Sequence, residues 1–103
     1  MTYSVSWSAA AIEDVKELFE YLAFNATLWD AEYVTEKVLA CADRLADFPR
    51  LYEADLRYGE GVRRISTMGQ HVLYELDDQT KTIRVLAVVG QRQKPRDMRV
   101  RAQ

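Results

Sequence analysis

The stretch Gly69–Arg92, GQHVLYELDDQTKTIRVLAVVGQR, contains two β-rich runs joined by a polar connection. The runs are His71–Leu76 and Thr82–Val89, and both are rich in the branched, aromatic and other apolar side chains that favour strands. The connection between them is short and polar, as in the loop of a β-hairpin. We therefore predict a hairpin here, with the rest of the chain organised around it.

Strict alternation of side chains assigns each residue of these two strands to a face of the sheet. One face would hold the mostly apolar set Val72, Tyr74, Leu76, Ile83, Val85, Ala87 and Val89. The opposite face would hold His71 and Arg84 with Leu73, Glu75, Leu86 and Val88, and the same alternation continues to Gly90 and Arg92. If the apolar face is turned inward, the sequence predicts a polar, cationic face that is open to solvent.

A strand and an amphipathic helix are predicted at the start of the chain. In Tyr3–Trp7, aromatic and branched residues alternate with serine, which is the pattern of a half-buried strand. Ser8 is well placed to cap a helix, because its hydroxyl can accept a hydrogen bond from a free N–H of the first turn. Within Ile12–Leu22 apolar residues recur at three- and four-residue spacings, so one side of this helix should face a core.

A second helix and a further strand precede the hairpin. Thr27–Asp30 resembles a capping box with Asp in place of the usual Glu, and the apolar face that follows continues to Phe48, where Pro49 predicts the end of the helix. After an ordered loop, Val62–Thr67 is expected to be a strand with Arg64 on the outward face. The predicted order is β-α-α-β-β-β. This is an α+β fold in which a helical hairpin packs on one face of a small, mainly antiparallel twisted sheet.

The 103 residues suit a single domain, 1–103, and the composition is that of a soluble globular protein. The net charge of −2 conceals an asymmetry between the two halves of the chain. Through Phe48 there are nine acidic and three basic residues, whereas from Pro49 onward there are seven acidic and eleven basic residues. A basic tail begins at about Arg92. This tail either binds an anionic partner or is simply a solvated terminus.

Several classes of site are not supported by the sequence. A single cysteine excludes an internal disulfide, and one cysteine with one histidine argues against a zinc site. We find no Gly-rich phosphate loop and no nucleophile–base pair, and we expect neither a metal nor a cofactor. No apolar run approaches the ~20 residues that a membrane span needs. With no signal-peptide pattern, we expect a cytoplasmic protein without membrane contact.

Charged and aromatic side chains supply the binding candidates. Fixed cations on the outward face could hold phosphates, and a histidine there could transfer a proton; the residues are Arg64, His71, Arg84 and Arg92, with Lys94 and Arg96 just beyond. The alternative is that this sheet face is simply exposed to solvent and its charged residues bind nothing. The aromatic candidates lie at the edges of the apolar stripes, and they either form an exposed protein-binding patch or complete the core; they are Trp29, Tyr33 and Tyr52.

Four segments give the chain a resemblance to the RelE/ParE superfamily of bacterial toxin–antitoxin toxins. They are Arg44–Pro49, Gly61–Arg64, Gly69–Tyr74 and Ile83–Leu86, and their joint order and spacing extend over nearly the whole length. The resemblance implies a cytoplasmic type II toxin, held inactive by a cognate antitoxin whose extended or helical segment wraps around it. It also implies that the pair represses its own operon, with operator DNA bound through the antitoxin.

The RelE branch of this superfamily enters the ribosomal A site and cuts messenger RNA. By resemblance, Arg64 matches a strand cation of that branch, and Val89–Arg92 matches its Val-Gly-Lys-Arg ending, so that Arg92 would contact the reacting phosphate. Two positions depart from the branch, because His71 stands where it commonly has Arg and Met98 falls about where it has Tyr. A thioether cannot transfer a proton, and loss of a general acid–base group typically costs ~10²–10⁴ in rate. The catalytic set for this branch would be Arg64, His71 and Arg92.

The ParE branch poisons DNA gyrase and does not cut RNA. The two long helices, Leu45–Pro49 and His71–Tyr74 resemble this branch more closely, although Val88–Gly90 replaces the Leu-His pair that usually ends its last strand. We favour a ParE-like gyrase inhibitor, with a RelE-like, ribosome-dependent mRNA endoribonuclease as the alternative. The candidates for partner binding are Trp29, Tyr33, Tyr52, Arg84, Lys94, Arg96, Met98 and Arg99.

Overall fold

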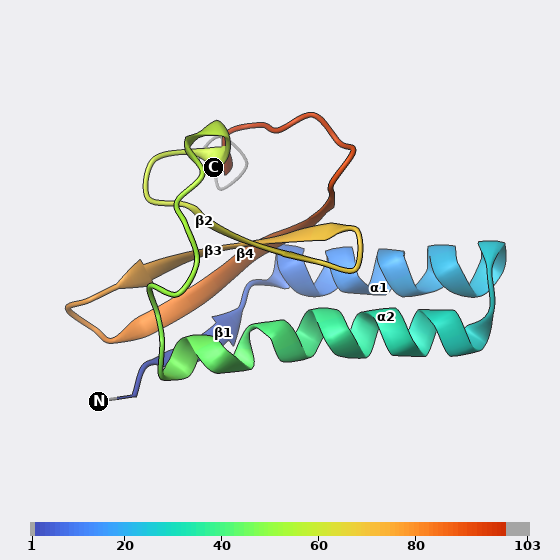
Figure 1. The fold of residues 1–103 in the computed structure, drawn as a ribbon, viewed down its shortest axis with the longest axis horizontal. Coiled ribbons are helices and arrows are strands. Elements are labelled where there is room, and N and C mark those ends of the chain that lie inside the picture. The colour runs from blue at the N-terminus through green and yellow to red at the C-terminus, as the bar shows by residue number, and fades with distance from the viewer. Residues whose placement is uncertain (1, 99–103) are drawn as a thin grey trace.

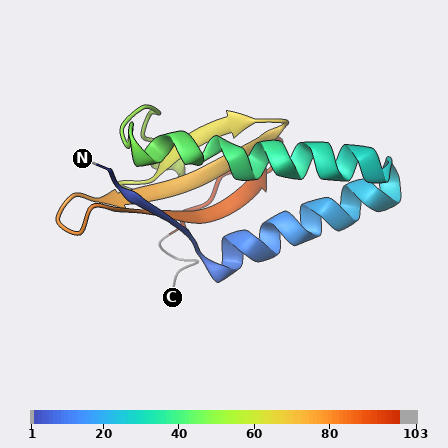
Figure 2. The same ribbon diagram turned by 90° about the horizontal axis from the view of Figure 1, so that it is seen from below.

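The structure is a computed structural model that describes residues 2–98. Its elements follow the predicted order: β1 (Ser4–Trp7), α1 (Ala9–Asn25), α2 (Leu28–Cys41), the 3₁₀ segments η1 (Asp43–Ala46) and η2 (Leu56–Tyr58), then β2 (Arg63–Thr67), β3 (Gln70–Asp77) and β4 (Thr82–Gly90). The two helices form a hairpin that covers one face of the sheet, and its far end projects beyond the sheet (Figure 1, Figure 2). The predicted α+β class is confirmed.

The sheet has the strand order β1-β4-β3-β2. The pairs β2–β3 and β3–β4 are antiparallel, as predicted, whereas β1 lies parallel to β4 with Ser4 opposite Thr82. A parallel pair requires a long crossover connection, and here the intervening chain includes both helices. The β2–β3 loop is tight, because Met68 and Gly69 both have positive φ angles, 51° and 77°, as in the type I′ turn that matches strand twist.

Both predicted helix caps are present. The hydroxyl of Ser8 accepts a hydrogen bond of 3.1 Å from the N–H of Ala11, and the hydroxyl of Thr27 accepts one of 3.0 Å from the N–H of Asp30. Each contact satisfies one of the N–H groups that a helix start leaves without an internal partner.

The end of the second helix differs from the prediction. The α-helix ends at Cys41, and the chain then tightens into η1, which has about three residues per turn. The change of pitch keeps Leu45 buried but turns the following residues out of the α-helical phase. Phe48, which we expected in the core, is therefore 58% exposed.

A β-bulge in β4 overturns the predicted assignment of faces. Leu73 pairs with Ala87, but the next residue, Tyr74, pairs with Val85, so Leu86 has no partner across the strands. One extra residue reverses the alternation beyond it. Val88 consequently packs in the main core between sheet and helices, whereas Ala87 turns to the opposite face with Val89, contrary to the sequence prediction.

The sheet face away from the helices carries a second, smaller core. This cluster consists of Tyr58, Val62, Leu73, Ala87 and Met98, with Leu86 and Val89 packed against it. The loop that contains η2 and the segment after β4 lie over this face (Figure 1). The expectation of an open cationic face is therefore wrong, because apolar side chains cover its centre.

Candidate functional site

A hydrogen-bonded pair, Ser66 and His71, lies beside the β2–β3 turn on the sheet face away from the helices. The two residues are register partners, and the Ser66 hydroxyl lies 2.9 Å from Nδ1 of His71. The His71 ring also meets the ring of Tyr58 edge to face, with the centroids 6.3 Å apart. His71 is only 9% exposed, so the expectation of a solvent-facing histidine is wrong. This pair was not predictable from the sequence, because only the strand register brings the two side chains together.

The surroundings of His71 favour its neutral form. Burial lowers the pKa of the imidazole, the guanidinium groups of Arg64 and Arg57 lower it further, and only Asp55 opposes them. At neutral pH the ring is therefore uncharged and serves as a hydrogen-bond partner of Ser66. A neutral, buried ring does not supply the positive charge that phosphate binding needs.

Arg64 is held in an ion pair. Its guanidinium donates a hydrogen bond of 3.1 Å to Asp55, which also accepts bonds of 2.7 and 3.0 Å from the side chain of Arg57. Hydrogen bonding from Arg57 lowers the pKa of Asp55, so the carboxylate stays ionised. The ion pair fixes the direction of Arg64 and offsets part of its charge.

The predicted set of four cationic residues does not assemble into one cluster. Arg64, His71 and Arg84 do share a sheet face, but Arg84 stands opposite Glu75 and lines a separate cavity. Arg92 is exposed in the turn after β4. Within residues 2–98, no hydrogen bond or ion pair joins any two of the four.

A cavity of about 330 Å³ lies between η2 and the segment that follows β4. Gln93 closes a turn here, because its side-chain carbonyl accepts a hydrogen bond of 3.0 Å from the N–H of Gly90, and its own N–H donates one of 3.1 Å to the Gly90 carbonyl. Two cations, Lys94 and Arg96, have no ion-pair partner in the described part of the chain. The lining contains no carboxylate and comprises Tyr58, Val89, Gln93, Lys94, Arg96 and Met98.

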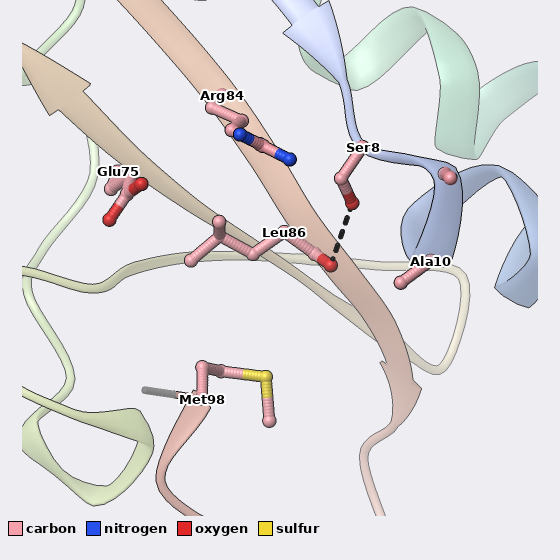
Figure 3. A pocket seen from close by; sticks show the side chains of 7 residues that line it. Ser8, Ala10, Glu75, Arg84, Leu86 and Met98 are labelled. Carbon is pink, nitrogen blue, oxygen red and sulfur yellow. Dashed lines mark hydrogen bonds between the residues drawn. The ribbon is translucent and has the colours of Figure 1, made fainter. Parts of the chain in front are cut away.

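A second cavity, of about 360 Å³, is also lined by Met98 and reaches the start of α1 (Figure 3). Arg84 and Glu75 supply its charged groups. The hydroxyl of Ser8 donates a hydrogen bond of 3.1 Å to the carbonyl of Leu86, the bulged residue of β4. The Ser8 hydroxyl that caps α1 therefore also gives the Leu86 carbonyl a hydrogen-bond donor, at the point where strand pairing is interrupted.

A third, more open hollow of about 820 Å³ runs between α1 and the end of β4. Its α1 wall carries Asp14 and Glu17 among apolar residues, and Arg96 contributes to its lining. It shares Val89, Gln93 and Arg96 with the first cavity, which in turn shares Met98 with the second. We refer to these three adjoining hollows as the C-terminal groove. The groove brings together four of the predicted partner-binding residues, Arg84, Lys94, Arg96 and Met98.

The three aromatic candidates do not form one patch. Trp29 and Tyr33 are exposed on α2 and stack on each other, with ring centroids 5.0 Å apart and planes within 10°. Tyr52 instead packs against the main core, and its carbonyl accepts a hydrogen bond of 2.6 Å from Arg63. Three more exposed large apolar residues lie near this end of the helical hairpin, Tyr21, Phe24 and Leu28, and they were not among the predicted candidates.

The remaining predictions concern Arg99, metals and membranes. Arg99 lies outside the described residues. Within residues 2–98 no group of three or more His, Cys, Asp or Glu side chains is placed to hold a metal ion. In the same part of the chain, no helix has the length and apolar character required to span a membrane.

Comparisons with known proteins agree with this architecture. Residues 5–95 match the family described as "ParE toxin of type II toxin-antitoxin system, parDE". A search of curated proteins gave no significant match.

Solved structures from both branches of the superfamily are similar in fold. A chain from the chromosomal ParDE toxin–antitoxin system of P. aeruginosa aligns with a TM-score of 0.75 and 13% identity, over 86% of this chain and 96% of that one. A chain from the RelBE2 toxin–antitoxin complex of Mycobacterium tuberculosis aligns with a TM-score of 0.68 and 20% identity, over 88% of this chain and 100% of that one. A chain from the intact E. coli RelBE toxin–antitoxin complex aligns with a TM-score of 0.65 and 16% identity, over 88% of this chain and 99% of that one. The family match, which spans most of the sequence, shows that this chain belongs to the ParE toxins of type II toxin–antitoxin systems.

Proposed function

We propose that this ParE-family toxin inhibits DNA gyrase and that a cognate antitoxin neutralises it in the cytoplasm. The observation that carries the proposal is the state of the residues that RNA cleavage would use. Arg64 is paired with Asp55, and His71 is buried, neutral and bonded to Ser66. Met98 is buried and offers only a thioether. These features favour a toxin that acts by binding over one that transfers protons on RNA.

A RelE-like endoribonuclease is the second candidate. The first cavity of the C-terminal groove supports it, because Lys94 and Arg96 are unpaired there and Tyr58 lines the same space. Burial raises the pKa of Tyr58, so its phenol stays protonated and able to donate at neutral pH. In this alternative the two cations would hold a phosphate, and activity would depend on the ribosome.

The C-terminal groove is the proposed antitoxin site. Its surface combines apolar residues such as Met98 and Val89 with the free cations Lys94 and Arg96. An antitoxin segment that alternates acidic and apolar side chains would pair with both kinds of group. In this proposal the toxin contacts operator DNA only through that antitoxin.

A supercoiling assay with purified full-length toxin and gyrase tests the gyrase proposal. We expect loss of supercoiling as toxin is added, and recovery when the antitoxin is supplied. Normal gyrase activity at excess toxin would contradict the proposal. Primer extension on translated messenger RNA tests the alternative, which predicts cleavage that Lys94→Ala and Arg96→Ala abolish.

A further inference from the structure

The far end of the helical hairpin exposes a group of large apolar side chains. We refer to Tyr21, Phe24, Leu28, Trp29 and Tyr33 as the hairpin tip. Phe24 is 89% exposed and Trp29 is 67% exposed. The far end of the hairpin extends past the sheet (Figure 1, Figure 2), although Tyr21 also lines the third hollow beside β4. Several large exposed apolar side chains at one end of a hairpin, two of them stacked on each other, mark an interaction surface more often than isolated ones do.

The charge around the hairpin tip is predominantly negative, and Lys37 is the cation that lies against it, over the ring of Tyr33. Residues 17–36 contain five acidic residues and no Lys, Arg or His. Four of the five carboxylates are exposed, on Glu17, Glu20, Glu32 and Glu36. The carboxylate of Asp30 already has a hydrogen-bond partner at the start of α2, because it accepts a bond of 2.8 Å from the Thr27 hydroxyl. An apolar, aromatic surface with an acidic rim is complementary to a partner that carries cations beside apolar side chains.

The stacked aromatic pair already takes part in a contact of this kind. The ammonium group of Lys37 lies 5.4 Å from the ring centroid of Tyr33. Trp29 is more exposed than Tyr33, and an indole ring attracts a Lys or Arg side chain more strongly than a phenol does. The tip therefore offers both a cation–π site and carboxylates to an incoming cation.

We propose that the hairpin tip is a docking surface for a basic amphipathic segment of a partner protein, distinct from the cationic first cavity of the C-terminal groove, although Tyr21 also lines the third hollow of that groove. Nucleic acid does not fit, since its phosphates would meet the carboxylates. A symmetric pairing of two tips does not fit either, because it would bring the acidic residues of both copies together. The first cavity of the C-terminal groove differs in chemistry, since its charged groups are the cations Lys94 and Arg96.

Isothermal titration calorimetry of the full-length chain with designed peptides tests this proposal. The probe is a helical peptide of about 18 residues with Leu on one side and Lys on the other, a length that gives about five turns. One comparison peptide replaces every Lys by Glu, and a second keeps Lys but replaces Leu by Ser. We expect the Leu/Lys peptide to bind at least about tenfold more tightly than either comparison peptide.

Substitutions at the tip assign the binding to this surface. Trp29→Ala and Phe24→Ser should each weaken binding of the Leu/Lys peptide by about tenfold or more, and Glu32→Lys should weaken it while strengthening binding of the Leu/Glu peptide. Leu56→Ser, at an apolar residue of η2 that is also highly exposed, is the matched control and should leave both affinities unchanged. All four positions are exposed, so each variant should retain the wild-type circular dichroism spectrum.

Three results would overturn the proposal. The first is equal affinity for the Lys and Glu peptides, and the second is an effect of Leu56→Ser as large as that of Trp29→Ala. The third is a dimer of the free chain that Trp29→Ala dissociates, because the tip would then be a self-association surface.

Discussion

The carboxylate of Asp14 in α1 accepts a hydrogen bond of 3.0 Å from the backbone N–H of Val88 in β4, 74 residues further along the chain. The pairing of β1 with β4 ends at Trp7 and Val85, so β4 has no strand neighbour on that side beyond this point. Asp14 supplies the acceptor that a neighbouring strand would have supplied. The bond thereby ties α1 to the part of β4 that lines the C-terminal groove.

Replacement of Asp14 by Ala should lower the free energy of unfolding by about 1–3 kcal/mol, because the N–H of Val88 loses this acceptor in a buried position. Asp14→Asn keeps a side-chain carbonyl oxygen and should retain most of the stability. Glu13→Ala, at an exposed position on the same helix, is the control. Urea denaturation measures the three variants. Wild-type stability in Asp14→Ala would show that another acceptor replaces the carboxylate.

The element order and both helix caps were predictable, because they depend on local sequence. The bulge at Leu86 was not, because nothing within β4 marks it. Its stability depends on distant groups, namely the Ser8 hydroxyl that binds the Leu86 carbonyl and the Asp14 carboxylate that binds Val88. Since one extra residue reverses the alternation, the bulge places Ala87 and Val88 on the sheet faces opposite to those predicted.

His71 should make stability depend on pH below its ordinary pKa of about 6.5. Its pKa is lowered in the folded chain by burial and by Arg64 and Arg57, so the unfolded chain binds the proton more tightly. The contribution of neutral His71 to the free energy of unfolding is therefore fully present above the pKa that this residue has in the unfolded chain. It is lost as the pH decreases toward the pKa of His71 in the folded chain. His71 is the only histidine, so its NMR titration is unambiguous and should give a pKa below the ordinary value. His71→Gln should flatten the pH dependence of urea denaturation in this range. A normal or raised pKa would contradict the described environment.

Cys41 should react slowly with thiol reagents in the folded chain. Burial, followed by the nearby negative charge of Asp43, raises its pKa to about 11, so little thiolate is present at pH 8. Reaction with a chromogenic disulfide should be much faster in denaturant than in buffer. Equal rates in the two conditions would mean that Cys41 is accessible in the folded state.

Charge reversal in the C-terminal groove should weaken antitoxin binding. Lys94→Glu and Arg96→Glu place a carboxylate where the proposed acidic segment would bind, so each should reduce the affinity by about tenfold or more. Lys16→Glu makes the same change on an exposed position of α1 and is the matched control. Surface plasmon resonance at two salt concentrations measures the effect. Equal losses in all three variants would point to long-range charge and not to contact at the groove.

The candidate site was predictable only in part. The basic residues after β4 were visible in the sequence, and the structure places Lys94, Arg96 and Met98 around one cavity. The partner of that segment, Tyr58, lies in a stretch without periodicity, so the second core was not foreseen. The pairing of Arg64 with Asp55 likewise depends on how the loop before β2 folds back, which residue spacing does not reveal.

Gyrase-dependent DNA cleavage is the most direct test of the central claim. Purified toxin, gyrase, ATP and supercoiled plasmid are incubated, the protein is denatured and digested, and the DNA is separated by electrophoresis. We expect linear DNA that increases with toxin concentration, requires gyrase and disappears when the antitoxin is added first. Intact plasmid at excess toxin, together with codon-linked cleavage of translated messenger RNA by the same preparation, would contradict it.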